Sequence, residues 1–153
     1  MGAIRNLDAT GLPLLFARII VGFPFLYYGA QKISDPIAFL KSIEAYNMLP
    51  AEPSWIINGV AVILPWIEVL CAGALLSGIQ LRAAALWTTG LLAVFTPAIY
   101  LLGVSLVGTK PEFQSLCDVI ADCGCGSGAV PVCPKLATNC GLLLLSLWAL
   151  LSR

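Results

Sequence analysis

The sequence has no histidine and few charged residues: only 10% of its 153 residues are Asp, Glu, Lys or Arg. The absence of histidine excludes histidine-ligated haem, zinc and copper sites with imidazole ligands, and catalysis by an imidazole base. The formal net charge is zero and Lys and Arg form no cluster, so a surface for the phosphate backbone of nucleic acid is missing. Any redox chemistry must therefore rely on sulfur or on a bound organic cofactor.

Hydrophobic residues make up 59% of the chain, more than the roughly 45–50% of soluble domains. A helix needs about 20 mostly apolar residues to cross the hydrocarbon core of a bilayer. Four stretches approach or exceed that length: 12–33, 55–76, 83–107 and 136–151. The sequence therefore predicts an all-α fold, an integral membrane four-helix bundle that forms a single transmembrane domain over 1–153. The first stretch is expected to be a retained helix, because no small-residue cleavage pattern closes it.

A further short helix is predicted between the first two spans. Asp35 followed by Pro36 is a typical N-cap and first helical residue, and apolar residues follow at helical spacing. This pattern favours an amphipathic connector at the membrane surface. Trp55 then marks the interface at which the second span begins.

The third connection, residues 108–135, holds Cys117, Cys123, Cys125 and Cys133. Three interpretations are open. Two structural disulfides would allow three connectivities, and a four-thiolate metal site is disfavoured because the paired Cys-x-x-Cys spacing of zinc knuckles is missing. Thiol–disulfide exchange is favoured because a bridge across Gly124 would close a small strained ring, and strained bridges are the labile ones.

Two further cysteine positions bear on a redox role. Cys133 precedes Pro134, which places it at the predicted N-cap of the fourth span, where the helix dipole and Lys135 favour a thiolate. Cys140 lies two turns further on, about 10 Å deeper, where it is either an electron relay or inert packing. Cys71 is expected to be a buried apolar residue.

Ionisable residues within the spans are functional candidates because charge is costly in lipid. Arg18 and Glu68 are predicted to lie at similar depths and to pair, either as a structural link between the first two spans or as a polar anchor for a quinone headgroup or a proton relay. Lys32, near the end of the first span, is expected to reach the interface or Asp35.

Orientation is only weakly set by Lys and Arg. Four spans place both termini on one side of the membrane. Because clustered cysteines persist as disulfides in oxidising compartments, the termini are predicted to be cytoplasmic and the cysteine loop periplasmic or extracellular, in a bacterial-type inner membrane.

Several short segments carry a family resemblance. They include Ala17-Arg18-Ile19-Ile20-Val21-Gly22, Tyr28-Gly29-Ala30-Gln31-Lys32-Ile33, Asp35-Pro36, Leu64-Pro65-Trp66-Ile67-Glu68 and Asp122-Cys123-Gly124-Cys125. In order and spacing they resemble DoxX-like membrane proteins, and the later segments narrow the likeness to the MauE (methylamine utilisation) branch. The resemblance implies a four-helix membrane protein linked to periplasmic disulfide chemistry, cofactor maturation of a partner enzyme or quinone-linked sulfur oxidation.

Together these observations predict a thiol–disulfide redox protein that passes electrons between periplasmic thiols or a partner protein and the membrane quinone pool. The predicted exchange cysteines are Cys117, Cys123, Cys125, Cys133 and Cys140, and the predicted quinone-site residues are Arg18, Lys32 and Glu68. The alternative is a non-catalytic membrane subunit or maturation factor whose disulfides are structural. The lipid bilayer is an expected partner in both cases, and the sequence leaves the oligomeric state open.

Overall fold

The computed structural model of the chain describes residues 11–46, 53–122, 124 and 128–151. Its elements are α2 (Leu12–Ser34), α3 (Pro36–Tyr46), α4 (Trp55–Ser77), α5 (Leu81–Leu106), β1 (Ile120–Asp122), β2 (Ala129–Pro131) and α6 (Val132–Leu151). Four of these helices, α2, α4, α5 and α6, are long and apolar enough to cross a membrane. The predicted all-α membrane bundle is confirmed, and the largest boundary difference is that α6 begins at Val132 rather than at residue 136.

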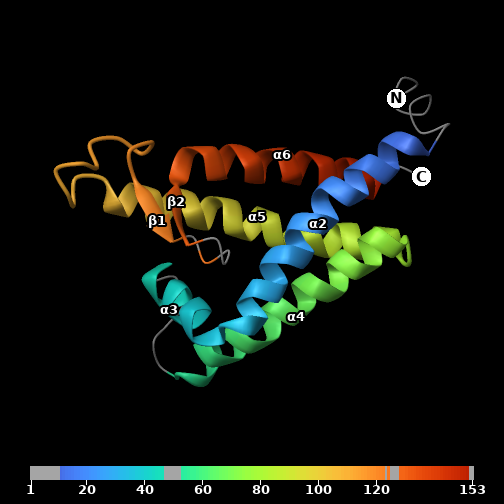
Figure 1. Ribbon diagram of the computed structural model, residues 1–153, viewed down its shortest axis with the longest axis horizontal. Helices are drawn as coiled ribbons and strands as arrows, with labels where there is room; N and C mark the ends of the chain where they lie inside the picture. The colour runs from blue at the N-terminus through green and yellow to red at the C-terminus, as the bar shows by residue number, and fades with distance from the viewer. Residues whose placement is uncertain (1–10, 47–52, 123, 125–127, 152–153) are drawn as a thin grey trace.

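The four long helices form two packed pairs, α2 with α4 and α5 with α6. Figure 1 shows the pairs diverging toward the end that carries α3 and the β1–β2 hairpin. The start of α2, the α4–α5 turn and the end of α6 lie at the other end of the molecule (Figure 1). The two ends of the described chain are therefore on the same side, as four crossings require.

Two glycines set how α2 meets α4. A Cβ on Gly22 would lie 2.9 Å from Leu76 Cγ, and a Cβ on Gly29 would lie 2.9 Å from Val69 Cγ2. Spaced seven residues apart, these glycines share one face of α2 and let the two backbones approach closely. This contact fixes the antiparallel register of the two helices.

Large apolar side chains cover the outside of the long helices. Phe23, Leu70 and Leu144 are each more than 60% exposed, which in water would leave much apolar surface unburied. Trp55, at the first residue of α4, is 72% exposed, in keeping with its predicted place at the interface. This outward apolar surface is what a multi-pass membrane protein presents to lipid.

The predicted connector helix is present as α3. Asp35 Oδ1 accepts a hydrogen bond from the Ala38 amide at 3.0 Å, which is the expected N-cap interaction. One face of α3, with Phe39 and Ile43, is buried with Ile57 and Ala61 of α4 in a small apolar cluster. The connector is therefore packed against the bundle and closes the space between the diverging pairs.

Candidate functional site

The third connection folds into a short antiparallel hairpin in which Ala121 pairs with Val130. A disulfide between Cys117 and Cys133 joins the segment before β1 to the first turn of α6, with Cα atoms 4.9 Å apart. The Val132 amide donates to the Val119 carbonyl at 3.0 Å, and both side chains are buried against α5. The bridge therefore fastens the base of the hairpin to the bundle. Cys123 and Cys125 lie outside the described residues.

The N-cap position predicted for Cys133 is wrong. Helix α6 begins at Val132, so Cys133 lies within its first turn, and its sulfur is bonded to Cys117. Proline is tolerated throughout the first turn of a helix, so Pro134 does not fix the starting residue. In this state Cys133 is not a free thiol, and any exchange role for it requires the bridge to open.

The two remaining described cysteines are free thiols. Cys71 is buried, as predicted, whereas Cys140 is exposed on α6 and is not among the residues that line the cavity described below. Within the described part of the chain no three Cys, Asp or Glu residues lie together as a metal site would require.

The charged pair inside the bundle differs from the prediction. Glu68 is paired with Lys32: Lys32 Nζ lies 2.7 Å from Glu68 Oε1 and 2.9 Å from Oε2. The two side chains are only 6% and 4% exposed. The expectation that Lys32 reaches the interface or Asp35 is therefore wrong. The two oxygens of Glu68 accept at most two of the three N–H donors of Lys32.

Arg18 has a different partner. Its guanidinium donates to the backbone carbonyls of Leu75 at 2.7 Å and Leu76 at 3.1 Å, which are among the unsatisfied carbonyls at the C-terminus of α4. The glycine contacts place residue 18 beside Gly78, about 15 Å along α4 from Glu68. The pairing of Arg18 with Glu68 fails because depths counted from the helix ends miss this register.

The ammonium of Lys32 is also enclosed by aromatic rings. Its Nζ lies 4.8 Å from the centroid of Phe39, on α3, and 5.1 Å from the centroid of Phe95, on α5. Cation–π contacts of this kind help to hold a desolvated cation. Lys32 is thus held at the place where α2, α3, α4 and α5 meet.

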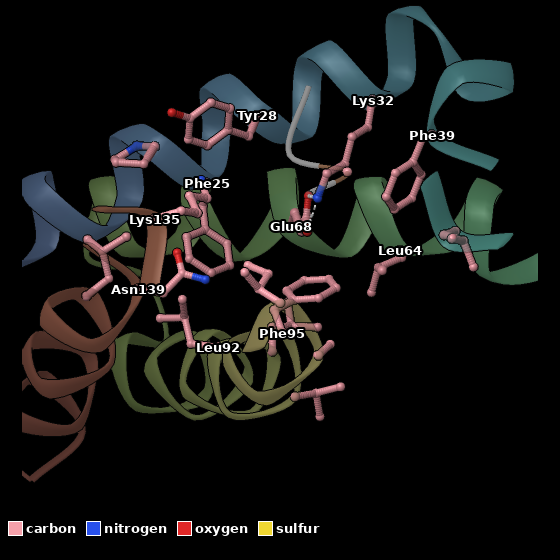
Figure 2. A pocket seen from close by; sticks show the side chains of 18 of the residues that line it. Phe25, Tyr28, Lys32, Phe39, Leu64, Glu68, Leu92, Phe95, Lys135 and Asn139 are labelled. Carbon is pink, nitrogen blue, oxygen red and sulfur yellow. Dashed lines mark hydrogen bonds and ion pairs between the residues drawn. The ribbon is translucent and has the colours of Figure 1, made fainter. Parts of the chain in front are cut away.

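This place is one wall of a cavity of about 470 Å³, within the roughly 300–1,000 Å³ range of small-molecule sites. Its lining comes from five helices and from Gly124 in the cysteine loop. Most of the lining is apolar, with five aromatic side chains: Phe25, Tyr28, Phe39, Tyr46 and Phe95. Figure 2 shows the Lys32–Glu68 pair facing this space. An apolar cavity with a few polar groups is the usual composition of a ligand site.

A second polar region of the lining comes from α6. Lys135 Nζ lies 4.5 Å from the centroid of the Tyr28 ring, and Asn139, one turn further along α6, is 6% exposed. In Figure 2 Asn139 lies away from the Lys32–Glu68 pair, near Phe25 and Leu92. Sequence reasoning missed Asn139, although a polar residue within an apolar span is a recognisable signal.

A smaller cavity of about 230 Å³ adjoins the first and shares Lys32, Phe39 and Gly124 with it. Its other walls include the carboxylates of Asp35 and Asp122, which are exposed. Gly124 is buried, and its amide donates to Asp122 Oδ1 at 2.9 Å. The hairpin thus contributes a backbone wall between a polar outer cavity and the apolar inner one.

Four apolar spanning helices, a disulfide-fastened hairpin and an internal cavity of ligand-like size define a multi-pass membrane protein. The chain matches the family model described as methylamine utilisation protein MauE over residues 10–152, and it belongs to that family. No curated protein and no solved structure matches it. The wider DoxX-like resemblance stays a prediction.

Proposed function

We propose that this MauE-family protein oxidises thiols at Cys123 and Cys125 and passes the electrons to a quinone held in the inner cavity. In the overall reaction two thiols form one disulfide, and the two electrons and two protons released convert one quinone to one quinol. The thiols belong to a small dithiol or to a partner protein, which exchanges with the Cys123–Cys125 pair.

The observation that carries this proposal is the position of Gly124. It is bonded to both Cys123 and Cys125, and it lines both the polar outer cavity and the inner cavity. Its φ of +63° is a conformation that favours glycine, and a Cβ there would lie 3.1 Å from Ser42 Cβ on α3. The covalent chain alone therefore ties the two sulfur-bearing residues to the wall of the cavity.

The charges around the cavity suit the reduction of a carbonyl compound. Negative charge develops on the quinone oxygens as electrons arrive, and nearby fixed cations in a dry site stabilise it. Lys32 and Lys135 both line the cavity, and of these two lysines only Lys32 forms a salt bridge with a described residue. Among the described lining residues, the cavity walls therefore carry one more cation than anion.

A lipid-soluble substrate also needs a way in from the bilayer. Val94, on α5, lines the inner cavity, and the residue is 63% exposed. It lies about 20 Å from the start of that 26-residue helix, well within the span. The cavity thus reaches the lipid-facing surface, where a quinone with an isoprenoid tail could enter sideways.

For the orientation we propose cytoplasmic termini and a periplasmic hairpin in the inner membrane. The Cys117–Cys133 bridge supports this placement, because disulfides persist on the oxidising side of a membrane. The hairpin would then meet periplasmic thiols while the inner cavity meets the quinone pool.

A second function is favoured by the same bridge. It fastens the hairpin base to α6, which is what a purely structural disulfide does. If Cys123 and Cys125 were structural as well, the protein would be a membrane partner that presents its hairpin to an enzyme during maturation.

The direct test is a quinone-reduction assay with purified protein in detergent, a reduced dithiol and a short-chain ubiquinone. The rate of quinone reduction is measured from the loss of quinone absorbance. Cys123→Ser and Cys125→Ser should each abolish the rate, because neither variant can form the bridge. Cys71→Ala is the matched control, since Cys71 lies outside both cavities. Normal turnover in both serine variants would favour the maturation role.

A second variant tests the wall itself. Gly124→Ala should slow quinone reduction because the added methyl group would press on Ser42 and Phe39. Gly108→Ala imposes a similar positive-φ strain, at φ +77°, but its Cβ would have nothing within 4 Å. Equal rates in the two variants would show that the Gly124 contact plays no part.

A further inference from the structure

We infer that Asn139 is the recognition residue for one ring carbonyl of the quinone and that Lys32 meets the opposite carbonyl. This inference rests on the proposed function, since it assigns the two ends of the same substrate. It adds a positioning role for α6 that the cysteines and the ion pair do not require.

The amide of Asn139 is buried and has no hydrogen-bond partner among the described residues. Its side chain is 6% exposed and lines the inner cavity, yet it makes no hydrogen bond to any residue that the structure describes. The other buried polar side chains of the described chain are satisfied: Ser42, Thr88 and Ser146 each bond to a carbonyl of their own helix, and Lys32 and Glu68 bond to each other. Asn139 is therefore the exception, and a buried amide left unpaired lowers the stability of the folded protein.

The location of the Asn139 amide favours a role in binding a ligand over a structural role. In Figure 2 it extends into the cavity near Phe25 and Leu92, two apolar side chains that offer it no acceptor. Asn139 shares a face of α6 with Lys135 and Leu142, which also line the cavity. A hydrogen-bonding ligand in the cavity would remove the cost of the unpaired amide.

The donors on the two sides of the cavity fit the acceptor pattern of a quinone. A quinone carbonyl only accepts hydrogen bonds, and its ring carries two such groups on opposite edges. Asn139 has two N–H donors, and Lys32 has a third N–H beyond those that Glu68 accepts. Figure 2 shows the two residues on different sides of the cavity, with Phe25 drawn between them. A planar ring lying among these aromatic side chains would present one carbonyl to each donor.

Substitution of Asn139 should therefore change stability and quinone affinity in a way that substitution of a purely structural residue would not. Asn139→Leu keeps the branched shape and the number of heavy atoms of the side chain and removes the unpaired amide, so the ligand-free protein should become more resistant to unfolding. The same variant should bind quinone more weakly, because a donor to the carbonyl is lost. Stability and affinity are therefore expected to move in opposite directions.

The experiment measures binding of a short-chain ubiquinone to the full chain in detergent by quenching of intrinsic fluorescence, and unfolding of the ligand-free protein by added SDS. Asn139→Leu and Asn139→Ala should both weaken binding roughly three- to tenfold, the loss expected for one net hydrogen bond. Asn58→Leu is the matched control, since Asn58 is exposed on α4 and lies outside both cavities. Its quinone affinity should equal that of the wild type.

Unchanged affinity in both Asn139 variants would overturn the inference while leaving quinone reduction in place. Weaker binding in both, together with a more stable ligand-free Asn139→Leu protein, would support it. Weaker binding with loss of stability in both variants would mean that Asn139 serves packing, which also overturns it. If the wild type itself binds no quinone, both the inference and the proposed function fail.

Discussion

Removing one partner of the Lys32–Glu68 pair should be far more harmful than removing both. The ammonium and carboxylate lie 2.7 Å apart with side chains 6% and 4% exposed, so Lys32→Met or Glu68→Met alone leaves a buried charge without its partner. Such losses cost about 3–5 kcal/mol, whereas apolar replacement of a whole buried pair is often neutral. Each single variant should therefore lower the ratio of folded to unfolded protein roughly a hundredfold or more.

Equilibrium unfolding by SDS in mixed micelles, followed by circular dichroism, measures these free energies. The double variant Lys32→Met/Glu68→Met should lose less stability than either single variant. Lys41→Met is the control, because Lys41 is exposed on α3. Additive losses in the double variant, or single losses below about 1 kcal/mol, would refute the reasoning from burial and distance.

Three further outcomes are expected. Gly29→Ala should destabilise the bundle in the same assay, because the added Cβ would lie 2.9 Å from Val69 Cγ2. The control Gly59→Ala, whose Cβ would have nothing within 4 Å, should stabilise the bundle by about 0.5–1 kcal/mol. Equal effects of the two substitutions would contradict the α2–α4 register. Cys117→Ser and Cys133→Ser should each lower the free energy of unfolding by about 3 kcal/mol, the value for a disulfide that closes a loop near this length. The double variant should lose no more than either single variant, and additive losses would argue against the bridge. Limited proteolysis of the hairpin gives an independent readout. A membrane-impermeant maleimide should label the third connection in reduced intact cells, and labelling only after lysis would reverse the proposed orientation.

The sequence predicts the spans well because crossing a bilayer imposes a length and an apolar composition that can be counted directly. The starts of α2 and α4 are predicted to the residue, and the N-cap role of Asp35 follows from local chemistry alone. The start of α6 is missed because Pro134 is compatible with several positions in the first turn.

The site is predicted less well because it depends on how helices pack. Glu68 is correctly identified as a buried charge in need of a partner, but the choice between Arg18 and Lys32 depends on the register that Gly22 and Gly29 impose. No local pattern indicates that Phe95 and Asn139 face the same cavity. Side chains from five helices converge there, and periodicity describes only one helix at a time.

The most direct test of the central claim is a single-turnover reaction between anaerobic, dithiol-reduced protein and a short-chain ubiquinone. Quinol formation is followed by absorbance, and the cysteines of the same sample are then identified by alkylation and mass spectrometry. We expect one quinol per chain, with Cys123 and Cys125 becoming resistant to alkylation together as the quinol forms. Quinol formation with both cysteines still open to alkylation, or no quinol at all, would contradict electron transfer across the wall that Gly124 provides.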